Sequence, residues 1–174
     1  LLMLDTRQYG RDRQIQPKEY LTKSGFNQAK FYNDLNAENR DLLGSEQLAW
    51  IENSVLKTDA VWTIFGQQIL MAKLKFPDLS KMIASGEIPS FLKPYLKFLG
   101  LGIPSNLDAW DGYPAERNKL YKLMNGANKK FISLAGDTHN SWVSELEDLS
   151  GKKVGVELGA PSVTSPGITD ILSL

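Results

Sequence analysis

The chain has 174 residues, with 20 lysines and arginines against 20 aspartates and glutamates, so its formal net charge is zero. This balance argues against nucleic acid as the main partner, because binding a phosphate backbone by charge needs a basic excess. The chain has no cysteine and a single histidine, His139. That composition excludes disulfides, thiolate zinc sites, iron–sulfur clusters and any metal site with two histidines from this chain. The length suits one domain with a sizeable core.

The first half of the chain predicts a strand, a helix and a second strand. Residues 1–4 are apolar and favour a buried strand, whereas residues 8–43 are polar and aromatic and favour a long loop with short helical pieces. A helix is predicted from an N-cap at Ser45 to about residue 58. Its apolar stripe consists of Leu48, Ile51 and Val55. Residues 61–65 are β-branched and aromatic, which is typical of a buried strand.

The second half opens with residues 71–107, which contain four prolines and predict an inserted excursion of short helices and turns. Residues 108–113 form a turn, in which Trp110 and Tyr113 are interpreted as packing residues. Pro114 suits the first position of a helix that Asn125-Gly126 ends, and its apolar face consists of Leu120, Leu123 and Met124. Two further strands are predicted over residues 131–135 and 154–158, and a turn-rich segment over residues 161–167.

This alternation of strands and helices predicts an α/β fold with a largely parallel or mixed sheet. Ligands bind beyond the carboxyl ends of the strands in such sheets. We therefore expect convergence of three polar pairs that follow apolar runs, namely Asp5 with Arg7, Gln67 with Gln68, and Asp137 with His139.

Each pair has a chemical and a structural interpretation. Asp137 and His139 are two residues apart, so in an extended chain both side chains would point the same way and could bind one metal ion or one substrate group. The alternative is that Asp137 caps a loop and His139 is half-buried. A Gln67 carbonyl oxygen is a hard ligand suited to Ca²⁺, or the amide is satisfied within a loop. Arg7 forms an ion pair with Asp5 or holds a phosphate.

The chain resembles the PhoD-like alkaline phosphatases and phosphodiesterases, a branch of the calcineurin-like metallophosphatases. The resemblance rests on motifs in the family's order: MLDTR (3–7), RD (11–12), QLAW (47–50), WTIFGQQ (62–68), DAWDGYPAER (108–117), LAGDTH (134–139) and PSVTSPG (161–167). It implies a β-sheet sandwich flanked by helices, with metals at the strand ends. It also implies that residues 1–174 are part of a larger domain, incomplete at the N-terminus and also at the C-terminus. The abrupt apolar start at Leu1 agrees with this expectation.

The resemblance also implies metal-dependent hydrolysis of phosphomonoesters or phosphodiesters by the parent protein. Asp137, His139 and Gln67 are then the expected metal-site residues, with Arg7, Asp137 and His139 as catalytic residues and iron plus calcium as the metals. The expected partners are a phosphate-ester substrate and the missing N-terminal part of the domain. The isolated segment is expected to be inactive.

The family further implies a periplasmic or secreted location, although no leader or membrane-spanning run is present in this sequence. The rival hypothesis is a non-catalytic scaffold or interaction domain that kept the sheet and lost the metal centre.

Overall fold

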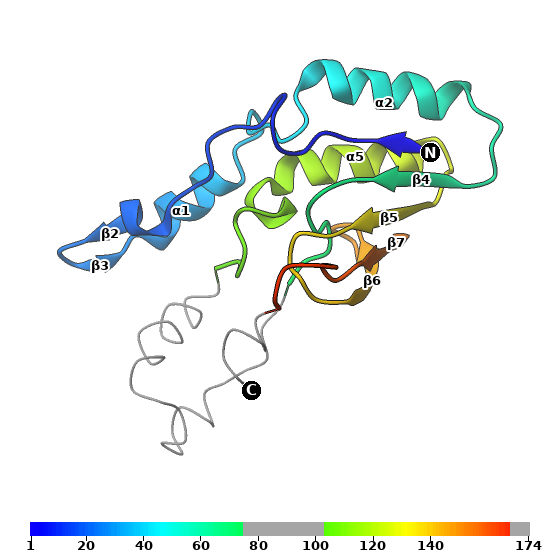
Figure 1. Cartoon of the computed structure of the whole chain (residues 1–174). Coiled ribbons are helices and arrows are strands. Elements are labelled where there is room, and N and C mark those ends of the chain that lie inside the picture. Colours follow the sequence, from blue (N-terminus) through cyan, green and yellow to red (C-terminus); the bar gives the residue numbers. More distant parts are fainter. Residues whose placement is uncertain (75–102, 168–174) are drawn as a thin grey trace.

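The computed structural model describes residues 1–74 and 103–167, and these form a five-stranded mixed sheet with helices (Figure 1). In sheet order the strands are β1 (Leu2–Met3), β4 (Thr63–Gly66), β5 (Phe131–Ala135), β7 (Lys153–Gly159) and β6 (Trp142–Glu147). The first four strands run parallel, and β6 pairs antiparallel with β7. The predicted α/β class is confirmed.

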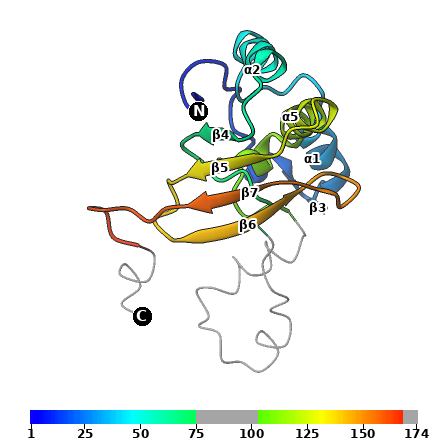
Figure 2. The same ribbon diagram turned by 90° about the vertical axis from the view of Figure 1, so that its right-hand side faces the viewer.

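Two helices cover one face of this sheet, α2 (Ser45–Lys57) and α5 (Pro114–Gly126), as Figure 2 shows. Side chains alternate between the two faces of a sheet, so Phe65 and Phe131 point under the helices, and their tilted rings contact each other at 4.9 Å between centroids. These rings belong to the main core, which also takes Ile51 from α2 and Leu120 from α5. Burial of these apolar faces fixes the helices on the sheet.

The predicted helix 45–58 is confirmed in position and in its apolar stripe, with Ile51 and Val55 buried. Its N-cap prediction is wrong, because Ser45 is the first helical residue and Gly44 is the cap. Gly44 has φ of 79°, a left-handed conformation that favours glycine.

The predicted helix after residue 113 is also confirmed, from Pro114 at its first turn to Gly126. A short 3₁₀ helix, η3 (Trp110–Gly112), precedes it. The side chains of Trp110 and Tyr113 are fully buried, so their interpretation as packing residues is confirmed.

Residues 8–43 contain the expected short helical pieces and one hairpin that the sequence did not suggest. In chain order the elements are η1 (Pro17–Tyr20), β2 (Leu21–Thr22), β3 (Gly25–Phe26) and α1 (Gln28–Leu35). Tyr20 and Phe31 pack edge to face at 5.3 Å and form part of a second, smaller core. This unit lies beyond the carboxyl ends of the strands of the main sheet (Figure 1).

Two strand predictions need correction at their edges, and one strand was missed. Within residues 1–4 only Leu2–Met3 form a strand, and Met3 is exposed because it lies on the face of the sheet away from the helices. The strand expected over residues 61–65 begins at Thr63, and Trp62 before it is exposed. β6 was not predicted, because only one of its residues, Leu146, is buried and the apolar signal is weak.

The face of the sheet away from the helices is apolar and partly exposed. The strand register aligns Met3, Gly66, Leu134, Leu158 and Val143 in one row across the sheet. The described strands thus supply one large sheet of the expected sandwich. Most of the predicted excursion over residues 71–107 lies outside the described residues. None of the described helices is long and apolar enough to cross a membrane.

Candidate functional site

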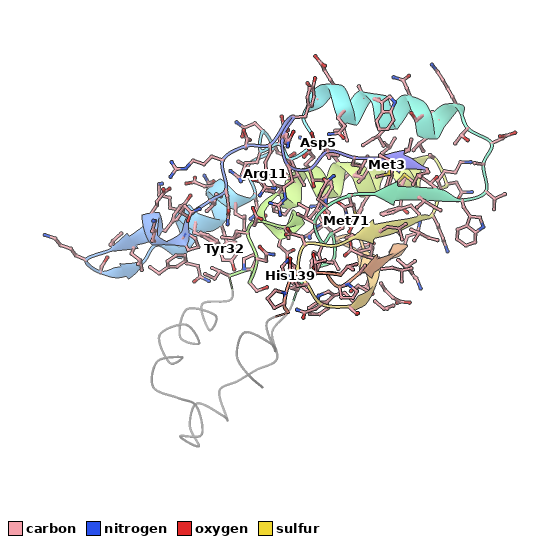
Figure 3. All side chains as sticks on the ribbon, viewed as in Figure 1. Met3, Asp5, Arg11, Tyr32, Met71 and His139 are labelled. Carbon is pink, nitrogen blue, oxygen red and sulfur yellow. The ribbon has the colours of Figure 1, made fainter. Side chains whose placement is uncertain are left out.

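Two of the three predicted polar pairs meet beyond the carboxyl ends of β1 and β5. Nη2 of Arg7 lies 2.7 Å from Oδ2 of Asp137, and both side chains are about one-third exposed, at 31% and 37%. His139 follows two residues after Asp137. Figure 3 shows His139, Asp5 and Arg11 on the same side of the molecule, past the end of the strand that carries Met3. The predicted convergence therefore holds for these two loops.

The loop after β1 is organised by Asp5, which does not pair with the Arg7 guanidinium. Its Oδ1 accepts hydrogen bonds from the backbone N–H groups of Gln8, at 2.9 Å, and Arg7, at 2.8 Å. These two hydrogen bonds lower the pKa of Asp5. The structural interpretation of an Asp5–Arg7 ion pair is wrong, because Asp5 turns the backbone and leaves the guanidinium to other carboxylates.

Two glutamines fix this loop on its neighbours. Gln47 of α2 accepts from the N–H of Asp5 at 2.7 Å and donates to the Asp5 carbonyl at 2.9 Å. Gln68, which follows β4, accepts from the N–H and hydroxyl of Thr6 at 2.9 and 2.6 Å, and donates to the Leu4 carbonyl at 3.0 Å. The backbone that carries Arg7 is thus held by α2 on one side and by β4 on the other.

The loop after β5 has an unusual backbone. Asp137 and His139 have φ of 71° and 58°, and they are two of the three non-glycine residues with positive φ in the described ranges. Asp and His tolerate this region better than most residues, and such conformations concentrate at functional sites. The premise of an extended chain from Asp137 to His139 is wrong, because the left-handed residues bend it.

His139 has one ring nitrogen engaged. Its Nδ1 lies 2.9 Å from the carbonyl oxygen of Pro166. A carbonyl oxygen only accepts, so this hydrogen bond requires the proton on Nδ1 and puts the lone pair of the neutral ring on Nε2. Histidines that bind metals commonly have this arrangement.

Gln67 lies in the core and not in this cluster. Its Oε1 accepts from Nε1 of Trp110 at 2.6 Å, and its Nε2 donates to Ser133 at 2.8 Å. The side-chain amide also approaches Glu157 at 3.4 Å. The hydrogen bond from Trp110 uses one of the two lone pairs of this amide oxygen.

Asp108 and Arg11 belong to the cluster but were not among the predicted site residues. Oδ2 of Asp108 lies 2.6 Å from Nη1 of Arg7, and Oδ1 lies 2.5 Å from Nη2 of Arg11. Arg11 also donates to the Thr6 carbonyl at 3.1 Å and lies 5.0 Å from the ring centroid of Tyr113. A charged run at residues 11–13 was visible in the sequence, but nothing local connects it to Asp108.

A second acid–arginine network lies in the core beside the site. Nη1 of Arg117 lies 2.7 Å from Oδ1 of Asp111 and donates to the Met71 carbonyl at 3.0 Å. The other Asp111 oxygen accepts from the Leu74 N–H at 3.0 Å. Glu157 accepts from the N–H groups of residues 71 and 72 at 2.7 and 2.8 Å. This network anchors residues 71–74 to α5 and the sheet.

The comparisons with known proteins agree with the resemblance of the motifs. The family model for the PhoD-like phosphatases matches residues 1–173. The chain belongs to the PhoD-like phosphatase family. It is 32% identical to alkaline phosphatase D of Bacillus subtilis (strain 168) over 170 residues, which are 95% of this chain and 24% of that protein.

The solved structure of PhoD matches with a TM-score of 0.63 and 30% identity, over 94% of this chain and 26% of that one. This PhoD-like chain therefore spans about a quarter of the length of these two relatives. The fold expected from the resemblance is confirmed by this match.

Two side chains of this PhoD-like chain, those of Asp137 and His139, carry atoms that could donate to a metal ion. Asp137 offers a carboxylate and His139 offers Nε2, a pair of hard and borderline donors. Residues 1–74 and 103–167 contain no group of three or more His, Cys, Asp or Glu side chains that could hold a metal ion together. A complete site would need ligands beyond these two.

Proposed function

We propose that the protein containing this chain hydrolyses phosphate esters, and that Arg7, Asp137 and His139 are this chain's contribution to its active site. The observation that carries the proposal is the 2.7 Å contact between Arg7 and Asp137, which joins the loops after β1 and β5 at the sheet edge where such folds bind ligands. Membership of the PhoD-like phosphatase family supports the reaction class.

Arg7 is suited to binding phosphate. A guanidinium has five N–H donors in a planar fork, and the contacts to Asp108 and Asp137 use one Nη atom each. No other group within the described residues bonds to the remaining N–H groups, which can therefore donate to phosphate oxygens. Partial burial lowers the pKa of Arg7, but hydrogen bonds and charge attraction from Asp108 and Asp137 raise it overall. The side chain therefore stays a cation.

Asp137 and His139 would hold a metal ion, and iron with calcium is the pair that the family resemblance implies. When bound, such ions stabilise the negative charge that develops on phosphate oxygens and lower the pKa of water. His139 serves through Nε2, since Pro166 fixes the proton on Nδ1. Asp137 orients Arg7 through Oδ2.

Two metal donors do not make a complete site, so we propose that the isolated 174-residue chain is inactive. Hydrolysis of p-nitrophenyl phosphate by this chain with Fe³⁺ and Ca²⁺, abolished by His139→Ala, would overturn that statement. A periplasmic or secreted location is proposed from the resemblance alone, and cell fractionation tests it.

The function itself is tested with the full-length protein. We expect it to hydrolyse p-nitrophenyl phosphate or bis-p-nitrophenyl phosphate, and the ratio of the two rates assigns a monoesterase or a diesterase. His139→Ala should lower kcat by roughly 100-fold or more, and metal analysis should find iron and calcium. A matched control is Asn140→Ala in the same loop. Absence of hydrolysis of both substrates would instead favour the scaffold hypothesis, whereas equal rates for the two variants would exclude His139 from the active site.

A further inference from the structure

Asp108 joins two arginines that come from a distant part of the sequence. Its Oδ2 contacts Nη1 of Arg7 at 2.6 Å, and its Oδ1 contacts Nη2 of Arg11 at 2.5 Å. The same Nη2 donates to the Asp108 backbone carbonyl at 2.8 Å. One carboxylate thus fixes the relative position of both guanidinium groups.

The backbone of Asp108 is itself held in place. Its N–H donates to the side chain of Asn106 at 3.0 Å. Leu107, Ala109 and Trp110 around it are buried, and the N–H of Trp110 donates to the Leu70 carbonyl at 3.2 Å. The carboxylate therefore projects from a packed segment, which is the requirement for holding another side chain in a defined geometry.

The contact with Asp108 determines which oxygen of Asp137 the Arg7 guanidinium binds. With Nη1 on Asp108 and Nη2 on Asp137, Arg7 touches only Oδ2 of Asp137. Oδ1 of Asp137 has no hydrogen bond or ion pair within residues 1–74 and 103–167. An arginine with a single carboxylate partner tends to bind both of its oxygens through two parallel hydrogen bonds. Without Asp108, Arg7 could close on Asp137 in this way and occupy both oxygens.

We propose that Asp108 is a positioning residue, which keeps Arg7 on one oxygen of Asp137 so that the guanidinium stays open to phosphate and Oδ1 of Asp137 stays open to a ligand. This inference rests on the proposed function. Arg11 supports Asp108, because its Nη1 ties it to the Thr6 carbonyl at 3.1 Å. Asp108 acts on the reaction through Arg7 and does not itself contact the substrate.

The test is a double-mutant cycle in the full-length protein, with p-nitrophenyl phosphate and bis-p-nitrophenyl phosphate as substrates. Asp108→Asn should lower kcat/KM by roughly 10- to 100-fold on the better substrate, because small displacements of a positioned group cost rate on this scale. In an Arg7→Met background the same substitution should change kcat/KM by less than about twofold. Arg11→Lys should act in the same direction with a smaller effect, since it loosens Asp108 without removing it.

The matched control is Glu19→Gln, which removes a carboxylate that contacts Arg13 at the same 2.6 Å on the surface. It should leave kcat/KM unchanged. A purely structural role of Asp108 would move the unfolding midpoint and would lower activity equally in both Arg7 backgrounds. An Asp108→Asn effect that persists with Met at position 7, or one no larger than that of Glu19→Gln, overturns the proposal.

Failure of the proposed function is visible separately, as a wild-type protein that hydrolyses neither substrate. The positioning role is then decided by the calorimetric Kd for inorganic phosphate. Asp108→Asn should raise that Kd in the Arg7 protein and leave it unchanged in the Arg7→Met protein. Equal shifts in the two backgrounds contradict the inference.

Discussion

The chain contains two acid–arginine contacts of the same length in opposite surroundings. Arg117 and Asp111 lie 2.7 Å apart in the core, with 3% and 7% of their side chains exposed. Arg7 and Asp137 also lie 2.7 Å apart, but at the sheet edge with 31% and 37% exposed. The buried pair has further hydrogen bonds to the backbone at residues 71 and 74. Within residues 1–74 and 103–167, the edge pair keeps N–H donors of Arg7 and Oδ1 of Asp137 without a partner.

This difference separates a structural role from a chemical one. Removal of one partner from a buried pair leaves an uncompensated charge, which costs about 3–5 kcal/mol. A partly exposed pair contributes roughly 0–1 kcal/mol, because water screens the attraction between its charges. The core network should therefore govern stability, and the edge cluster should govern activity. Substitutions in the core network and in the edge cluster test this difference.

The largest effect is expected at Arg117. Arg117→Met leaves the Asp111 carboxylate buried without its counter-charge, and should lower the free energy of unfolding by about 3–5 kcal/mol. Urea denaturation measures it. Arg13→Met is the control, since Arg13 is 80% exposed and should change stability by less than about 0.5 kcal/mol. Equal effects of the two substitutions would remove the contrast between core and edge.

A substitution of Gln67 tests whether this residue belongs to the core network or to the edge cluster. Gln67→Met leaves the Nε1 donor of Trp110 without its acceptor, so we expect a loss of about 1–3 kcal/mol in the free energy of unfolding. The hydrolytic activity of the folded fraction should persist. An unchanged stability with abolished activity would support the hypothesis that Gln67 is a metal ligand.

Glu157 gives the core network a pH dependence. Burial raises its pKa, against hydrogen bonds from Ala72 and Met71 that lower it. Its contribution to stability is then fully present below the ordinary pKa of 4.5 and is lost as the pH rises toward the higher pKa of the folded protein. This pH dependence has the opposite sign to that of Asp5, whose pKa is lowered by its backbone hydrogen bonds.

The substitution Glu157→Gln replaces the carboxyl group with an amide, which does not titrate. The free energy of unfolding of the wild type minus that of the variant should therefore fall as the pH rises from 4.5. Urea denaturation of both proteins at a series of pH values from 4.5 upward measures this difference in the free energy of unfolding. A difference that is constant or that rises with pH contradicts the raised pKa.

The smallest effect on stability is expected at Asp137. Asp137→Asn should change the free energy of unfolding by no more than about 1 kcal/mol, because both partners are about one-third exposed. Its effect on hydrolysis by the full-length protein should be large by comparison. A loss of stability close to that of Arg117→Met would give Asp137 a structural role instead.

Local patterns predicted the elements whose burial is periodic. Ile51 and Val55 mark α2, and the alternating burial of Phe131, Ser133 and Ala135 marks β5. β6 was not predicted, because its one buried residue, Leu146, gives no periodic hydrophobic pattern. The N-cap was misplaced by one residue, because the decisive feature is the positive φ of Gly44 and not a side-chain hydrogen bond.

The candidate site was only partly predictable for a different reason. The loops that hold Arg7 and Asp137 follow predicted strands. They were therefore predictable, because ligands bind beyond the carboxyl ends of the strands in such sheets. The two adjacent glutamines could not be distinguished, yet Gln67 enters the core and Gln68 holds the loop after β1. Asp108 lies 101 residues from its partner Arg7, and no local pattern encodes a contact over that separation.

We expect the edge cluster to govern hydrolysis and the core network to govern stability. This division of roles is tested by kcat/KM for phosphate-ester hydrolysis by full-length Arg7→Lys, alongside its unfolding midpoint. Lysine keeps the charge but loses the planar fork that reaches Asp108, Asp137 and phosphate together. We predict a loss of roughly 100-fold in kcat/KM with an unchanged midpoint. Activity within about threefold of wild type, at the same midpoint, would contradict this division of roles.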